Sequence, residues 1–199
     1  MSYDTYIGRY RDRLRQALDG VQLSQVDRFV EALEAARLAQ RTVFLFGNGG
    51  SASTASHIAC DLNKGVSQHK DVPFRALCVN DSLPTLTAWA NDVSYEEVFA
   101  GQLKNFLSPG DLLVAISGSG NSPNVIRAVE WAKAHGATVV GLCGYDGGRL
   151  KPLADVPIHV KIDDMQVAED LHLVICHMAI QALCGGVPVC SVPRSTPAP

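Results

Sequence analysis

The chain of 199 residues has no basic excess, no long apolar run and no closely spaced cysteine pair. Its 17 Lys and Arg residues are outnumbered by 20 Asp and Glu residues, and no basic stripe suits a nucleic acid. No apolar run approaches the roughly 20 residues that span a bilayer. The N-terminus also lacks the basic-then-apolar form of a secretory signal. We therefore expect neither a nucleic-acid partner nor a membrane partner.

The sequence has no CxxC motif, and most of its cysteines stand in apolar segments. This pattern favours small, reduced core residues over a disulfide framework or a thiolate metal site. We accordingly expect a cytoplasmic protein. The six cysteines are Cys60, Cys78, Cys143, Cys176, Cys184 and Cys190.

Apolar strand patterns alternate with helical patterns from residue 41 onward. Near-continuous apolar strands separated by helices predict an α/β fold, with a parallel sheet that is covered on both faces. The expected strands are 42–46, 75–79, 111–116, 137–142 and 156–160, and the expected helices are 51–64, 83–90, 95–107, 122–135 and 165–184.

The chain before this region carries a pair of amphipathic helices, at 3–19 and 24–40. No strand precedes them, so their apolar faces must pack on the α/β body or on another subunit. We expect an N-terminal helical extension at 1–40, a main domain at 41–186 and a mobile, proline-rich tail at 187–199.

Two glycine-rich loops each follow an expected strand and lead into an expected helix. The first is Gly47-Asn48-Gly49-Gly50-Ser51, and the second is Ser117-Gly118-Ser119-Gly120-Asn121-Ser122. Glycines allow backbone N–H groups to turn toward a ligand, and the helix N-terminus that follows favours an anion. Two such loops at the same edge of a parallel sheet predict a site for a phosphorylated small molecule.

The first loop also matches the dinucleotide fingerprint, as Gly47-x-Gly49-x-x-Ala52. That fingerprint needs an acidic residue at the end of the next strand, about 20 residues on. The next strand here ends late, at Val79-Asn80-Asp81, and a nicotinamide enzyme has no use for a second, serine-rich loop. The pair of loops therefore favours a phosphorylated sugar without a nucleotide cofactor.

Two helices carry imidazoles and carboxylates at helical spacing. His57 and Asp61 stand four residues apart on the helix that the first loop opens, so they share one face. On the last helix, Glu169 and His177 lie within about 80° of each other around the axis. Apolar neighbours of His177 in sequence predict that its ring is desolvated. Such clusters on apolar helices point to function more often than to structure.

These motifs together resemble the sugar isomerase (SIS) domain, and within it the phosphoheptose isomerases. The resemblance rests on Gly-Asn-Gly-Gly-Ser with His and Asp at 47–61, on Ile-Ser-Gly-Ser-Gly-Asn-Ser-Pro-Asn at 116–124, and on the two histidines at 172–177. It implies a flavodoxin-like, three-layer fold with a five-stranded parallel sheet. It also implies a homotetramer with active sites between subunits, and interconversion of sedoheptulose 7-phosphate and D-glycero-D-manno-heptose 7-phosphate.

The resemblance also assigns site residues by position. It implies that Asp61, Glu169 and His177 are catalytic, and that a divalent metal, zinc above others, binds His57, Asp61, Glu169 and His177. The implied substrate-binding residues are Asn48, Gly49, Gly50, Ser51, Asp92, Ser117, Gly118, Ser119, Asn121 and Ser122.

The chain departs from the family at two of these positions. The family usually has Glu where this chain has Asp61, and Gln where it has Glu169. Either carboxylate could then be the proton-abstracting base, and the extra charge should strengthen metal binding. Two other readings stay open: a non-catalytic SIS-fold tetramer that binds a replication initiator, and an isomerase or epimerase of another sugar phosphate.

Overall fold

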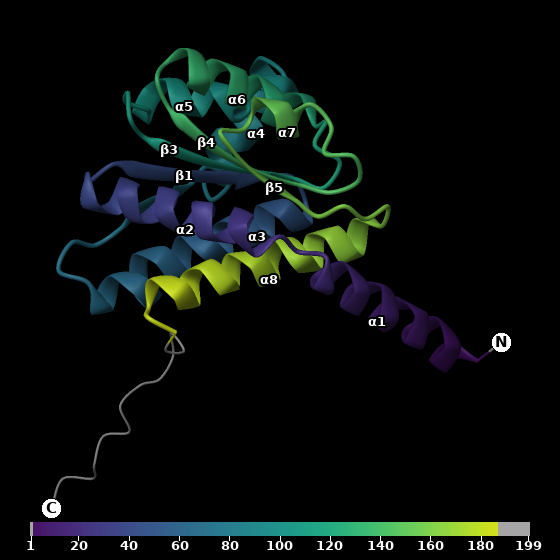
Figure 1. The fold of residues 1–199 in the computed structure, drawn as a ribbon. Coiled ribbons are helices and arrows are strands. Elements are labelled where there is room, and N and C mark those ends of the chain that lie inside the picture. Colours follow the sequence, from purple (N-terminus) through teal and green to yellow (C-terminus); the bar gives the residue numbers. More distant parts are fainter. Residues whose placement is uncertain (1, 187–199) are drawn as a thin grey trace, which may run out of the picture.

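Five parallel strands form the centre of the computed structural model, which describes residues 2–186 (Figure 1). Their order, β2-β1-β3-β4-β5, is the flavodoxin-like order and confirms the expected fold class. The tail expected to be mobile lies outside the described residues. The strands are β1 (Thr42–Gly47), β2 (Arg75–Cys78), β3 (Leu112–Ser117), β4 (Thr138–Cys143) and β5 (Val156–His159).

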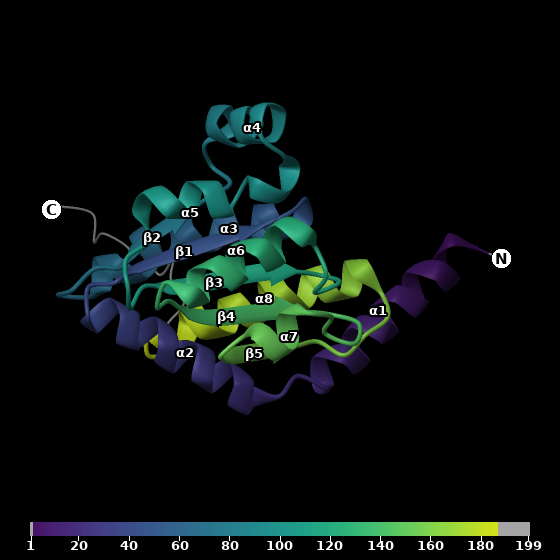
Figure 2. The same ribbon diagram turned by 90° about the horizontal axis from the view of Figure 1, so that it is seen from above.

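Helices cover both faces of the sheet and make three layers (Figure 1). One layer holds α2 (Leu23–Leu38), α3 (Gly50–Cys60) and α8 (Met165–Leu183). The opposite layer holds α5 (Ala100–Phe106), α6 (Pro123–Ala134) and the single turn α7 (Leu150–Leu153). Viewed from above, α4 (Leu83–Asp92) stands at the periphery (Figure 2).

The first helix, α1 (Tyr3–Asp19), contacts α8 and extends away from the body (Figure 1). None of its residues is buried. Two polar contacts attach it: Tyr10 Oη donates to Asp170 Oδ2 at 2.5 Å, and Arg13 lies 2.9 Å from Asp164. Three large apolar side chains, Tyr3, Tyr6 and Ile7, are left exposed.

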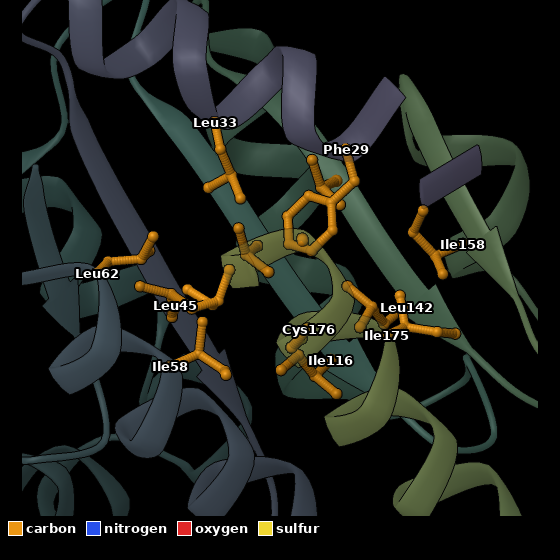
Figure 3. Close-up of a cluster of buried hydrophobic side chains, with 14 of the residues drawn as sticks. Phe29, Leu33, Leu45, Ile58, Leu62, Ile116, Leu142, Ile158, Ile175 and Cys176 are labelled. Atoms are coloured by element: carbon orange, nitrogen blue, oxygen red, sulfur yellow. The ribbon is translucent and has the colours of Figure 1, made fainter. Parts of the chain in front are cut away.

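Strand β1 is apolar throughout because side chains on both of its faces are buried. Phe44 and Phe46 enter the core on the α5–α6 side, whereas Val43 and Leu45 enter the core under α2, α3 and α8. In that second cluster, Phe29 from α2, Ile58 from α3 and Ile175 from α8 meet around the strands (Figure 3).

The expected elements are found with three differences. The helix expected at 51–64 becomes a π-helix over Asp61–Val66, where the side chain of Asn63 bonds both backbone groups of Ala76 on β2. The helix expected at 95–107 is divided into a 3₁₀ turn, Tyr95–Glu97, and α5. The single turn of α7 is too short to give a periodic signal.

Among residues 2–186, no helix is both long and apolar enough to cross a bilayer. The five cysteines in this range are free, and three of them, Cys78, Cys143 and Cys176, are buried as expected. Cys60 is exposed.

Candidate active site

The two glycine-rich loops lie at the point where the strand order reverses. Strands β1 and β3 are neighbours, but the chain leaves β1 toward α3 on one face and β3 toward α6 on the other. Such switch points form ligand-binding crevices at the carboxyl edge of open α/β sheets. The sheet topology therefore brings the two loops together as expected.

Asn48 in the first loop joins it to the second. Its Nδ2 donates to Asn124 Oδ1 at 2.9 Å, and its Oδ1 accepts from Asn124 Nδ2 at 3.0 Å and from Tyr95 Oη at 2.9 Å. Asn124 and Tyr95 were not expected from the sequence. The signal for Asn124 was its place at the end of the 116–124 motif, two residues after the serine loop.

The serine loop, Ser117–Ser122, presents hydroxyls and backbone amides at the start of α6. Ser117 Oγ and Ser122 Oγ lie 3.1 Å apart, and Ser119 Oγ accepts from the N–H of Asn121 at 3.2 Å. Ser122 is the N-cap residue of α6, yet its side chain makes no capping bond. Pro123 has no N–H, and the N–H of Val125 donates to Asn124 Oδ1 at 2.9 Å, so the first turn of α6 offers few free amides to an anion. The serine hydroxyls, one of which donates to the other in the Ser117–Ser122 pair, are the donors left for a phosphate.

An open groove of about 770 Å³ lies beside this loop. Ser119 and Asn121 line it from the loop, and Lys161 and Met165 line it from the segment that leads into α8. Met165 Sδ lies only 2.3 Å from where a Cβ on Gly118 would be, so a side chain at position 118 would displace the end of the Met165 side chain.

Of the ten residues expected to bind substrate, only Ser119 and Asn121 line this groove, and Ser51 and Asp92 are placed least favourably among the others. Ser51 is 4% exposed, and its Cβ lies against Gly47. Asp92 is exposed at the end of α4, and its Oδ1 accepts a hydrogen bond from Asn91 Nδ2 at 2.7 Å. The two residues remain predictions as substrate contacts.

His57, Asp61 and His177 meet on α3, the π-helix and α8. His57 Nε2 lies 2.9 Å from His177 Nε2 and 3.3 Å from Asp61 Oδ2, and His177 Nε2 lies 3.8 Å from Asp61 Oδ2. Ligand atoms bonded to one zinc ion at about 2.0–2.2 Å lie about 3.3–3.6 Å apart in a tetrahedron. The three donors are thus spaced to hold a divalent ion.

Glu169 does not join this group, so the expected set of four ligands is reduced to three. Its carboxylate lies over Gly50 instead, at the start of α3. Eight residues on a helix return nearly to the same face but advance about 12 Å along the axis. Glu169 and His177 therefore share a side of α8 and face opposite ends of α3.

The expectation that His177 is desolvated is wrong: 43% of its side chain is exposed. The buried histidine of α8 is His172, with an exposed fraction of 0%. His172 and His177 are five residues apart, so the directions of their side chains differ by about 140° around the helix axis. The two rings therefore point to different sides of α8. Burial lowers the pKa of His172 to about 4. The backbone of Cys143 lies near the ring and opposes this shift, but neither ring nitrogen makes a hydrogen bond.

Comparison with known proteins identifies the family of the chain. The SIS domain model matches residues 5–144, so the chain belongs to the SIS domain family. Its curated relatives include phosphoheptose isomerases from Helicobacter pylori, 38% identical over 85% of this chain and 87% of the relative, and from Crocosphaera subtropica, 44% identical over 68% of each chain. At these identities and coverages it belongs to the phosphoheptose isomerase family.

A solved structure of a related protein has the same fold. The phosphoheptose isomerase GmhA from Neisseria gonorrhoeae is 25% identical, with a TM-score of 0.85 over 92% of this chain and 100% of that chain.

Proposed function

We propose that the chain interconverts sedoheptulose 7-phosphate and D-glycero-D-manno-heptose 7-phosphate, as an aldose–ketose isomerase. The observation that carries this proposal is the convergence of Asp61, His57 and His177, on helices that adjoin the two glycine-rich loops. The names of the relatives support a phosphorylated seven-carbon sugar as substrate.

In the proposed reaction, Asp61 removes the proton from C1 of the ketose while His177 gives a proton to the carbonyl oxygen at C2. The electron pair of the broken C–H bond forms the C1–C2 double bond of an enediol. Asp61 then returns its proton to C2, and His177 takes the proton of the C1 hydroxyl, which leaves the aldehyde. The numbers of protons and electron pairs are thereby unchanged, as an isomerisation requires.

We infer that a divalent metal, with zinc the best fit, would be held by His57, Asp61 and His177. Two imidazoles and one carboxylate are typical zinc ligands. When bound, such an ion supplies Lewis acidity toward sugar oxygens. Both Nε2 atoms must offer lone pairs to the ion, so binding requires both rings to be neutral with their protons on Nδ1. With an ion bound, Nε2 of His177 would not carry the proton for the C2 oxygen, and a water in the site would supply it.

We further propose that the active site is shared between subunits of a homotetramer. Met165 beside the serine loop and His177 are twelve residues apart, or about 18 Å along α8. An extended seven-carbon sugar phosphate is shorter than this. The serine loop of one subunit would therefore act with the His57–Asp61–His177 group of another, and the exposed apolar residues of α1 support such contacts. The free cysteines support a reducing compartment such as the cytoplasm.

The direct test is to incubate the purified protein with sedoheptulose 7-phosphate in D₂O and follow the sugar by NMR. The proposal expects the aldose to appear with solvent deuterium at C2, because the abstracted proton exchanges on the carboxylate. Unchanged ketose, without deuterium at C1, would contradict it.

A further inference from the structure

Asn124 is a buried polar side chain at the start of α6, with 2% of its surface exposed. Its Oδ1 accepts hydrogen bonds from the backbone N–H of Val125 and from Asn48 Nδ2, each at 2.9 Å. A backbone N–H can only donate. The bond from Val125 therefore fixes which end of the Asn124 amide is the acceptor, and the donor end, Nδ2, must face Asn48.

The fixed amide of Asn124 sets the orientation of the Asn48 amide. Asn124 Nδ2 donates to Asn48 Oδ1 at 3.0 Å, and a reversed Asn48 amide would place two donors and two acceptors face to face. Tyr95 Oη also donates to Asn48 Oδ1, at 2.9 Å, so both lone pairs of this oxygen are in use. Within residues 2–186, the second Nδ2 hydrogen of Asn48 is the one hydrogen-bonding group of this side chain that is left for a ligand.

The backbone that carries Asn48 is also held. Asn80, which follows β2, accepts from the N–H of Gly47 at 3.2 Å and donates to its C=O at 2.9 Å. Asn48 itself is only partly buried, at the carboxyl end of β1 where the sheet switches direction. The fold thus holds this side chain in one arrangement before a ligand binds, which lowers the entropic cost of binding.

We propose that Asn124 and Tyr95 are positioning residues, which hold Asn48 so that it offers the substrate one hydrogen-bond donor and no acceptor. The inference rests on the proposed function, since it takes Asn48 as a substrate contact in the crevice between β1 and β3. A carbonyl, hydroxyl or phosphate oxygen of a sugar phosphate accepts such a bond. Asn124 and Tyr95 act on the substrate only through Asn48.

A double-mutant cycle separates positioning from direct contact. Dissociation constants for sedoheptulose 7-phosphate are measured by calorimetry on the full chain. Asn48→Ala removes the contact, and Asn124→Leu removes the hydrogen bonds of Asn124 without adding charge or changing the size of the side chain much. Tyr95→Phe removes one hydroxyl from a residue that is 55% exposed, so it keeps the fold. Asn105→Leu, on the exposed side of α5, is the control.

Asn48→Ala and Asn124→Leu should each weaken binding by roughly three- to tenfold, the range for a neutral hydrogen bond, and Tyr95→Phe by a smaller factor. Asn105→Leu should have no effect. In the Asn48→Ala background, neither Asn124→Leu nor Tyr95→Phe should weaken binding further, because both act through the group that is missing. Losses that multiply in the double variants would overturn the proposal, and so would unchanged binding in Asn48→Ala. The Tyr95 cycle decides the question if Asn124→Leu does not fold.

The side-chain amide signals of Asn48 give a direct readout by NMR, and they are assigned by their absence from Asn48→Ala. They should move when sedoheptulose 7-phosphate is added, and also in free Tyr95→Phe, but not in free Asn105→Leu. Signals that stay unchanged in Tyr95→Phe would contradict the positioning of Asn48. A wild type that binds the sugar phosphate in this way without converting it would instead contradict the proposed function alone.

Discussion

His57 Nε2 and His177 Nε2 lie 2.9 Å apart although 120 positions separate the residues in the chain. At this distance one nitrogen must donate and the other accept. A bound ion needs a lone pair from each, so the ring that donates must move its proton from Nε2 to Nδ1, and a doubly protonated ring cannot bind. We therefore expect Zn²⁺ binding to weaken as the pH falls, which calorimetric titrations at a series of pH values measure.

The ligand set gives a second prediction for the same titration. Asp61→Asn and His177→Gln each change a ligand, and each should weaken Zn²⁺ binding by roughly 10- to 100-fold or more. That range is typical of changes to residues that only support the ligands. Glu169→Gln should leave it unchanged, because the Glu169 carboxylate lies over Gly50. Equal weakening by Glu169→Gln and Asp61→Asn would contradict the three-residue group.

The serine loop should hold the phosphate of the substrate. Ser119→Ala and Ser122→Ala each remove a hydroxyl, and hydrogen bonds to charged groups are worth about 1.5–3 kcal/mol. We expect each change to weaken binding of the sugar phosphate by about tenfold or more, while Ser53→Ala on the exposed side of α3 has no effect. Equal affinity for the dephosphorylated sugar would show that the loop is not a phosphate site.

Much of this fold follows from local patterns, because parallel strands buried on both faces are apolar throughout. The run Val43 to Phe46 shows this, and its glycine-rich continuation indicates the edge where the ligand binds. The meeting of His57 with His177 was also expected, since each stands on a helix next to the site.

Other features depend on packing that no single helix reveals. Angular position around α8 suggested that Glu169 and His177 converge, but their separation along the axis sends them to different partners. Sequence neighbours suggested that His177 is buried, yet His172 is the ring that faces the sheet. Likewise, the π-helix after Cys60 coincides with Asn63 bonding to Ala76 on β2, which is a tertiary contact.

The buried imidazole of His172 should make folding sensitive to acid. Its pKa is lowered from 6.5 to about 4, so between these values the unfolded chain binds a proton that the folded chain does not. Stability should fall as the pH drops through this window, by about 1.4 kcal/mol per pH unit at most from this group. Denaturant titrations should show a shallower pH dependence for His172→Phe, and the same slope in both proteins would contradict the account.

The exposed apolar residues of α1 should be covered in an oligomer. Tyr6 is 55% exposed and Ile7 66% exposed in a single chain. Light scattering at micromolar concentration should show a tetramer, and Ile7→Asp should shift it toward smaller species, whereas Arg9→Ala should not. A monomeric wild type would rule out a site shared between subunits.

The central claim is that Asp61 moves the proton between C1 and C2 of a heptose phosphate. It is tested most directly by the rate of deuterium incorporation into sedoheptulose 7-phosphate in D₂O, measured by NMR for the wild type, Asp61→Asn and Glu169→Gln. The account predicts incorporation by the wild type, none above background for Asp61→Asn despite retained binding, and a measurable rate for Glu169→Gln. The reverse pattern, with Glu169→Gln inactive and Asp61→Asn active, would contradict it and assign the base to Glu169.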